Sequence, residues 1–185
     1  MNSAQALTRL KDGNARYIAD AKESTLQDAS RRDALTGGQS PFAIILSCAD
    51  SRVVPEMVFD TGLGELFVLR VAGNVANTST IASIEYAVAH LGTKLIVVLG
   101  HQSCGAVTAA MAGGDNGHNL NHLLAHLQPA VNACAGGTVD ETVCENARRT
   151  SQDLLDRSSI IRGAEGLKIV PAWYRLEGGG VEFLD

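Results

Sequence analysis

The sequence lacks a long apolar run, an excess of positive charge and a large number of cysteines. No stretch approaches the roughly 20 consecutive apolar residues that a membrane-spanning helix needs. The chain begins MNSAQALTRLKDGNARY, which carries charges early and lacks the apolar segment of a secretory signal. With a net charge of −5, the chain has no basic footprint for nucleic acid. These absences predict a cytoplasmic protein that binds neither membranes nor nucleic acids.

The four cysteines are expected to have roles other than disulfide formation. Thiols stay reduced in the cytoplasm, so these side chains are better interpreted as metal ligands or core residues. Cys134 and Cys144 have no ligand pattern around them and are interpreted as core or surface thiols. His118, His122 and His126 are spaced by four residues, which favours a solvated helix face over a second metal site.

Hydrophobic patterning predicts a single α/β domain over residues 1–185, with a central mostly parallel β-sheet flanked by helices. Short continuous apolar runs are typical of strands buried on both faces. Such runs occur at 42–48, 66–71, 94–100 and 167–170. Crossover helices are expected at 78–91, 104–112 and 140–157, with loop and short helix at 115–137. Residues 1–36 are polar, and we predict a helical arm that packs on a partner subunit.

Two short segments concentrate the side chains that carry chemistry. The first predicted strand is followed directly by Cys48-Ala49-Asp50-Ser51-Arg52, and the third by His101-Gln102-Ser103-Cys104-Gly105. Ligands of open α/β sheets bind at the carboxyl ends of the strands. Cys48, His101 and Cys104 make a set of two thiolates and one imidazole, like catalytic zinc sites that leave a fourth position open. The predicted helix that Cys104 begins would favour its thiolate form.

Asp50 is placed to act beside this ligand set. It lies two residues after Cys48, so it could bind the metal or contact whatever does. Arg52 could hold the carboxylate in a bidentate ion pair. A lone buried cysteine after a strand is usually only a small apolar residue. The conjunction of both segments at two strand ends favours the metal site.

Two other classes of function stay open on the residues alone. In a nonenzymatic zinc domain, Asp50 would be a permanent fourth ligand, and zinc would bind without any catalytic activity. A nucleotide-binding α/β module is the second alternative. The sequence disfavours it, because there is no G-x-G-x-x-G or P-loop and Gly62-Leu63-Gly64 is too short a signal.

With C-x-D-x-R and H-x-x-C at this separation, the sequence resembles the β-class carbonic anhydrases from Gly13 to about Met111. The resemblance implies a carbonate dehydratase, a lyase with one Zn²⁺ per subunit held by Cys48, His101 and Cys104, and with catalytic residues Asp50 and Arg52. It also implies substrate-binding residues at Gln39, Phe67, Ala72, Gly73 and Tyr86, with Asn74 beside Gly73. The family's pocket is built between two subunits, so a homodimer or a dimer of dimers is expected.

The implied reaction is the reversible hydration of CO2 to bicarbonate and a proton by attack of zinc-bound hydroxide. Asp50 would orient that hydroxide while Arg52 keeps Asp50 off the metal. In a closed state Asp50 would itself bind zinc. Two thiolates cancel the formal charge of the ion, so its water should ionise at higher pH than in a three-histidine site. Hydrolases of carbonyl sulfide and carbon disulfide share the fold and ligands, and they stay an alternative.

Ile45 distinguishes two branches of the family. Members inhibited by bicarbonate at a second, noncatalytic site carry a tryptophan three residues before the first ligand cysteine. That position is Ile45 here, and only the arginine of that site has a counterpart, in Arg70. The resemblance is therefore to the plant-type branch that is not regulated by bicarbonate.

Overall fold

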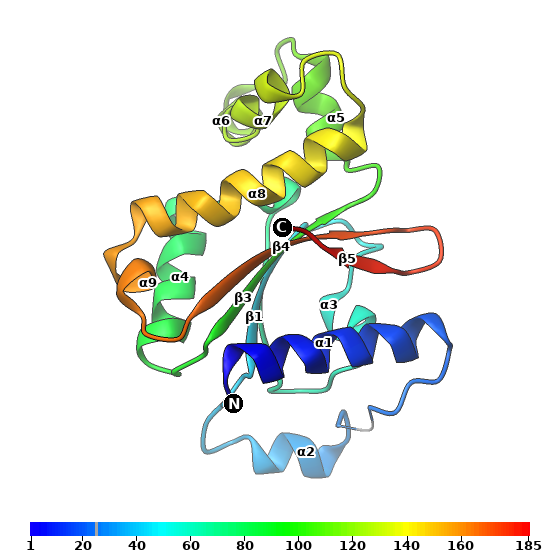
Figure 1. The fold of residues 1–185 in the computed structure, drawn as a ribbon, viewed down its shortest axis with the longest axis vertical. Coiled ribbons are helices and arrows are strands. Elements are labelled where there is room, and N and C mark those ends of the chain that lie inside the picture. The colour runs from blue at the N-terminus through cyan, green and yellow to red at the C-terminus, as the bar shows by residue number, and fades with distance from the viewer. Residues whose placement is uncertain (25) are drawn as a thin grey trace.

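A computed structural model describes residues 1–24 and 26–185, which form an α/β fold around one sheet (Figure 1). The strands are β1 (Ala43–Ser47), β2 (Leu66–Arg70), β3 (Leu95–His101), β4 (Lys168–Tyr174) and β5 (Val181–Phe183). The helices are α1 (Ser3–Ile18), α2 (Ala29–Ala34), α3 (Pro55–Val58), α4 (Thr78–Ala89), α5 (Gly105–Ala112), α6 (His118–Ala125), α7 (Gln128–Ala133), α8 (Val139–Arg157) and α9 (Ser159–Gly163), with a short 3-10 turn η1 (Ala72–Asn74). The predicted fold class is confirmed.

The sheet is mostly parallel, with strand order β2-β1-β3-β4-β5. β1 pairs in parallel with β2 and β3, β3 pairs in parallel with β4, and only β5 runs antiparallel to its neighbour among the described residues. Ile44 lies opposite Phe67 on one side and Ile96 on the other. Because β1 and β3 are parallel neighbours, their carboxyl ends meet at the same edge of the sheet. Both chemistry-bearing segments begin at this edge.

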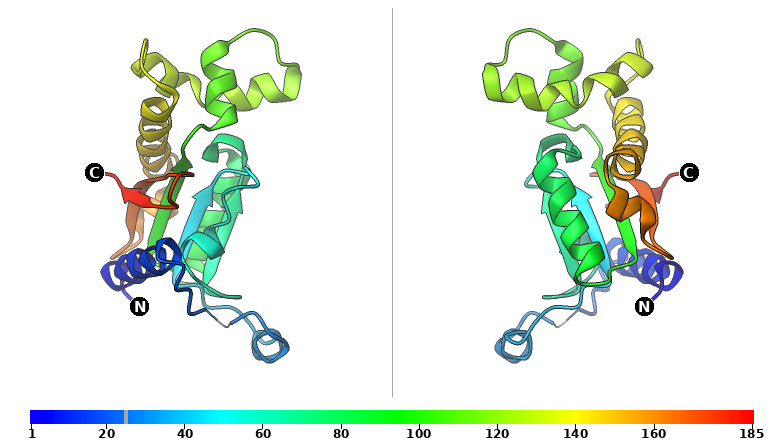
Figure 2. Two further views of the ribbon diagram at one scale, coloured as in Figure 1. Left: turned by 90° about the vertical axis from the view of Figure 1, so that its right-hand side faces the viewer. Right: turned by 90° about the vertical axis from the view of Figure 1, so that its left-hand side faces the viewer.

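Alternate side chains of the central strands enter two different cores, as the period of two in a strand requires. Ile44 packs with Ile84 of α4 and Leu154 of α8, whereas Ile45 packs with Leu10 of α1. All five side chains are fully buried, and each contributes about 1.5–3 kcal/mol of transfer free energy. In Figure 1 the sheet accordingly lies between α4 and α8 on one side and α1 on the other. Figure 2 shows α5, α6 and α7 beyond one end of the sheet and α2 beyond the opposite end.

The first helix of the N-terminal arm packs on the chain's own sheet. Leu10 is buried beside β1 and β3. Gly13 lies so close to α3 that an added Cβ would come within 2.0 Å of the Phe59 carbonyl oxygen. The Asn14 side chain donates hydrogen bonds to carbonyl oxygens of α3 and of the turn before β5. α1 thus belongs to the chain's own core. α2 buries no residue within the chain, and the expected contact of residues 1–36 with a partner subunit stays a prediction.

The helices predicted at 78–91, 104–112 and 140–157 are present as α4, α5 and α8, with ends shifted by at most two residues. α8 begins with a capping box between Thr138 and Glu141, which stabilises the first turn by about 1 kcal/mol. α3, α9 and β5 were not predicted, because elements of five residues or fewer carry almost no periodic signal. No helix in the described part of the chain is long and apolar enough to cross a bilayer.

Candidate metal centre

The first ligand-bearing turn starts where β1 ends. Cys48 directly follows Ser47 and is buried, with 4% of its surface exposed. The chain then turns back, because the Asp50 carboxylate accepts a hydrogen bond from the backbone N–H of Arg52 at 2.9 Å, and the N–H of Val53 donates to the Asp50 carbonyl oxygen at 3.0 Å. An Asp side chain that accepts from the backbone two residues on is a common turn device. The turn presents Cys48 and Asp50 at the same end of β1.

The second ligand-bearing turn starts where β3 ends. His101 is the last residue of β3, and Cys104 is the N-cap residue of α5. Between them Ser103 adopts a positive φ of 54°, which is uncommon for a residue other than glycine. The Nδ1 atom of His101 lies 3.0 Å from the Gln102 carbonyl oxygen. If Nδ1 donates this hydrogen bond, Nε2 has no proton and can serve as a ligand.

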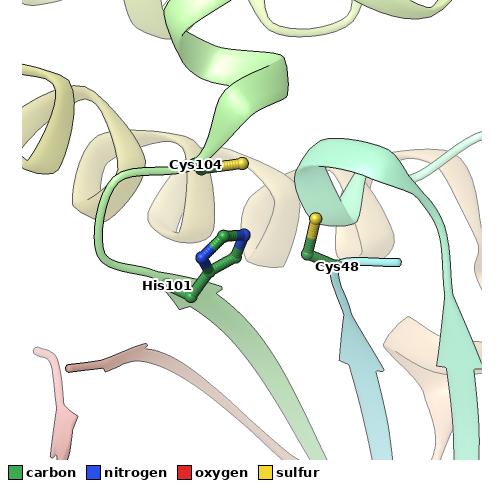
Figure 3. A group of neighbouring side chains, drawn as sticks. All are labelled: Cys48, His101 and Cys104. Carbon is green, nitrogen blue, oxygen red and sulfur yellow. The ribbon is translucent and has the colours of Figure 1, made fainter. Parts of the chain in front are cut away.

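Cys48, His101 and Cys104 meet as one buried cluster. Their ligand atoms lie within 4.8 Å of one another, and Figure 3 shows the two sulfur atoms and one ring nitrogen directed toward a common space. Nε2 of His101 is buried without a hydrogen-bond partner. An orphaned buried nitrogen is costly unless something binds it. The donor set and this unpartnered atom fit a zinc ion, which takes thiolate and imidazole ligands.

The pKa values of the two thiols in the cluster are shifted in opposite directions. The Cys104 thiol, the His101 ring and the N–H of Gly73 all favour the thiolate of Cys48, and they lower the pKa of Cys48 to about 4 despite its burial. The hydrogen bond with Cys48, burial and the charge on Cys48 raise the pKa of Cys104. Both sulfurs must be deprotonated to bind zinc, so metal binding at this site would release a proton.

Asp50 and Arg52 form a bidentate ion pair at the rim of the cluster. Nε and Nη2 of Arg52 donate to the two carboxylate oxygens at 2.9 and 2.8 Å. The Arg52 guanidinium is the main cause that holds the pKa of Asp50 far below its usual range. Asp50 Oδ2 lies 3.8 Å from Nε2 of His101. The carboxylate is therefore ionised and adjacent to the metal ligands.

The loop that contains Gly73 closes another side of the cluster. The N–H of Gly73 donates to Sγ of Cys48 at 3.4 Å, and the carbonyl oxygen of Gly73 accepts from the buried Asn146 side chain at 2.9 Å. Gly73 has a φ of 69°, and a Cβ there would lie 3.1 Å from the Leu127 methyl groups. Ala72 is half-buried beside it. The role of Asn146 was not predicted, since nothing in the residues around it in α8 signals a contact 73 positions away.

Three residues predicted to bind substrate lie away from the cluster within the chain. Gln39 is exposed and precedes the start of β1. Phe67 pairs with Ile44 near the start of β1. At the usual rise per residue of a strand, Ile44 lies roughly 13 Å from Cys48. Tyr86 packs against Phe67 with ring centroids 6.4 Å apart. Of the predicted pocket, the chain itself brings only Ala72 and Gly73 to the site.

The remaining cysteines and histidines form no comparable group. Among the described residues, Cys48, His101 and Cys104 are the one set of three ligands close enough to share an ion. Cys134 and Cys144 are half-buried free thiols. His122 and His126 stack edge to face, with ring centroids 5.5 Å apart, and no third ligand joins them within the residues that the structure covers.

The chain is similar to known carbonic anhydrases in sequence and in fold. The family model described as carbonic anhydrase matches residues 43–181. Carbonic anhydrase 2 of Mycobacterium tuberculosis is 41% identical over 96% of this chain and 91% of its own length. A carbonic anhydrase of Mycolicibacterium smegmatis is 40% identical over 98% and 93%. A tetrameric β-carbonic anhydrase of Sordaria macrospora superimposes with a TM-score of 0.77 at 26% identity, covering 98% of both chains.

Proposed function

This chain belongs to the carbonic anhydrase family, whose members are carbonate dehydratases, and we propose that it hydrates CO2 reversibly to bicarbonate and a proton at a zinc ion held by Cys48, His101 and Cys104. One observation carries the proposal. The buried cluster of two sulfurs and an unpartnered imidazole nitrogen stands beside an arginine-held carboxylate. A bound zinc ion would supply a Lewis acid that lowers the pKa of a water toward neutrality.

Asp50 is proposed to orient the attacking water. Its carboxylate is ionised throughout the working pH range, and three of its roughly four acceptor positions are taken by the backbone and side chain of Arg52. A remaining lone pair can accept a hydrogen bond from the nucleophile and so direct the nucleophile's own lone pair at the carbon of CO2. Arg52 holds the carboxylate in that position and opposes the closed state, in which Asp50 would itself bind zinc.

The CO2 pocket is proposed to be completed by a second copy of the chain. Ala72 and Gly73 would come from the subunit that holds the zinc, whereas Gln39, Phe67 and Tyr86 would come from its partner. Two observations support this division. Tyr86 is 48% exposed, and an open hollow of about 460 Å³ runs along the edge strand β2 beside Phe67. Unpaired edges of this kind are usually covered in the assembled protein.

The assembly is therefore proposed to be a homodimer or a dimer of dimers. The Sordaria macrospora relative is described as tetrameric. α2 and the exposed part of the N-terminal arm are candidates for further contact between subunits. We also propose a cytoplasmic location, because two thiolate ligands need a compartment that keeps cysteine reduced.

A comparison of substrates tests the proposed reaction. The zinc-loaded protein is mixed with CO2, and the release of protons is followed by stopped flow. Carbonyl sulfide and carbon disulfide are offered in parallel, and the formation of hydrogen sulfide is measured. We expect CO2 hydration to be faster by orders of magnitude. Preferential hydrolysis of the sulfur compounds would reassign the substrate, and zinc binding without turnover of any substrate would support a nonenzymatic zinc domain.

A further inference from the structure

The turn that carries Cys48 is held from outside by Arg70. This residue ends the edge strand β2. Its Nε donates to the carbonyl oxygen of Cys48 at 3.1 Å, and its Nη2 donates to the carbonyl oxygen of Asp50 at 2.6 Å. Hydrogen bonds from a charged donor are about twice as strong as neutral ones. One guanidinium therefore binds the backbone on both sides of Ala49 and fixes the positions of Cys48, a proposed ligand, and of Asp50, a proposed catalytic residue.

The turn that carries His101 and Cys104 is held from outside by Asp140. This residue lies in the first turn of α8, and its carboxylate accepts a hydrogen bond from the N–H of Ser103 at 2.8 Å. Ser103 is the residue with the positive φ between the two ligands. A non-glycine residue in this region costs on the order of 1 kcal/mol and persists only where its surroundings hold it. Asp140 supplies that hold.

We propose that Arg70 and Asp140 are a pair of positioning residues, one for each ligand-bearing turn, that preorganise the three-ligand zinc site. Neither belongs to the ligand set. Each reaches a turn from a separate element and bonds only to its backbone. The proposal rests on the proposed zinc site but does not depend on which substrate the site turns over.

Preorganisation of this kind should appear most clearly in the rate at which zinc leaves. With only three protein ligands, release of one is the first step of dissociation, and a turn that moves more freely lets a ligand go more often. Loss of outer-shell partners commonly lowers metal affinity about 10–100-fold. Arg70 also fixes the Asp50 carbonyl, so a looser turn should lower kcat more than it raises KM.

The experiment measures the zinc dissociation rate, using an excess of a coloured chelator and the intact zinc-loaded protein. We expect Arg70→Met and Asp140→Ala each to speed dissociation about 10-fold or more. The zinc dissociation rate of Arg70→Lys should lie between those of Arg70→Met and the unsubstituted protein, because an ammonium keeps the charge but lacks the planar pair of donors that reaches both carbonyl oxygens. Asp140→Asn should restore a slow rate, since its amide oxygen can still accept from Ser103.

Two exposed residues, an arginine that follows β4 and an aspartate on α8, provide matched controls. Arg175 pairs with exposed Glu182, and Asp156 accepts from Gln152 on α8. Arg175→Met and Asp156→Ala should leave dissociation within about twofold, the usual range for surface changes. The absorption spectrum of the cobalt-substituted protein supplies a second readout, which reports ligand geometry in the folded fraction alone.

The outcomes separate this proposal from the proposed function. Faster release in Arg70→Met and Asp140→Ala, with recovery in Asp140→Asn, would support positioning even if CO2 were not the substrate. Unchanged dissociation rates and unchanged cobalt spectra in both variants would overturn it, whatever the activity. Absence of zinc from the unsubstituted protein would instead contradict the proposed function itself.

Discussion

Arg52 holds both carboxylate oxygens of Asp50, at 2.9 and 2.8 Å, while one of those oxygens stays 3.8 Å from the ligand nitrogen of His101. A carboxylate this close to the ligands could move onto the metal only by giving up part of the two-pronged contact. We therefore propose that the guanidinium selects between an open site, in which water can bind, and a closed one, in which Asp50 occupies the fourth position.

Replacing Arg52 should close the site without emptying it. Arg52→Ala is expected to keep its zinc, because all three ligands remain, but to lose about 10–100-fold in activity. The pH–rate profile of the remaining activity should shift to higher pH, where hydroxide competes better with the carboxylate.

Arg52→Lys should recover only part of the activity, and Asp50→Ala should keep zinc yet turn over slowly. Zinc content and pH–rate profiles check this, with Arg149→Ala as an exposed control. A normal rate and an unshifted profile in Arg52→Ala would show that the pair does not gate the site.

Bicarbonate should not inhibit this protein cooperatively. Ile45 stands where the bicarbonate-inhibited members carry tryptophan, and Arg70 already donates to two backbone carbonyls. We expect a bicarbonate titration of the hydration rate to follow simple product inhibition with a Hill coefficient near one. Sigmoidal inhibition would refute the assignment to the unregulated branch.

Gln39 should act on the active site of the partner subunit. Gln39→Ala is expected to keep zinc and to lower kcat/KM, whereas Cys104→Ala should be inactive. A mixed dimer of these two variants combines intact ligands from one chain with an intact Gln39 from the other, so mixing should restore activity. Gln152→Ala, an exposed glutamine on α8, is the control. If mixing restores nothing, Gln39 does not act across the interface.

Asp60 should stabilise the fold in a pH-dependent manner. Burial by itself raises its pKa, but the N–H groups of Glu23 and Ser24 and the Arg16 guanidinium, with Nε at 2.6 Å, outweigh burial and lower the pKa below its ordinary value. A depressed folded-state pKa contributes stability that is complete above the unfolded pKa of about 3.9 and is lost as pH falls through the folded pKa.

Asp60→Asn should therefore lower the free energy of unfolding at pH 7 by about 1–3 kcal/mol. The difference in the free energy of unfolding between the variant and the unsubstituted protein should become smaller as the solution is acidified below the unfolded pKa. Denaturant titrations at several pH values measure this difference, and Asp20→Asn, at an exposed carboxylate, serves as control. A difference that does not change with pH would mean that Asp60 stabilises the fold through packing and not through its charge.

The cluster of Cys48, His101 and Cys104 could be predicted from the sequence because the sequence signals that place it are local. Each turn directly follows a strand with a continuous apolar run, and parallel pairing of those strands brings the two turns to one edge. The supporting contacts could not be predicted in the same way. Asp140 and Asn146 bind backbone groups 37 and 73 positions away. Because any residue type offers the same backbone groups, the sequence at the partner position gives no sign of such a hydrogen bond.

The core position of α1 was missed for a related physical reason. The helix is polar on average, and besides Leu10 it docks through small or polar residues. Gly13 allows close approach to α3, and Asn14 satisfies three backbone groups with its amide. Apolar periodicity detects neither contact. The proposed placement of Gln39, Phe67 and Tyr86 beside the metal likewise depends on a second chain, which the fold of one chain does not determine.

The zinc content and CO2 hydration rate of Cys104→Ala, measured beside Cys144→Ala, test the central claim most directly. Both substitutions remove one thiol, but only Cys104 belongs to the buried cluster. We predict that the unsubstituted protein and Cys144→Ala bind one zinc ion per chain and hydrate CO2, and that Cys104→Ala loses both properties. Full zinc occupancy together with normal hydration in Cys104→Ala would contradict the assignment of this cluster as the catalytic metal site.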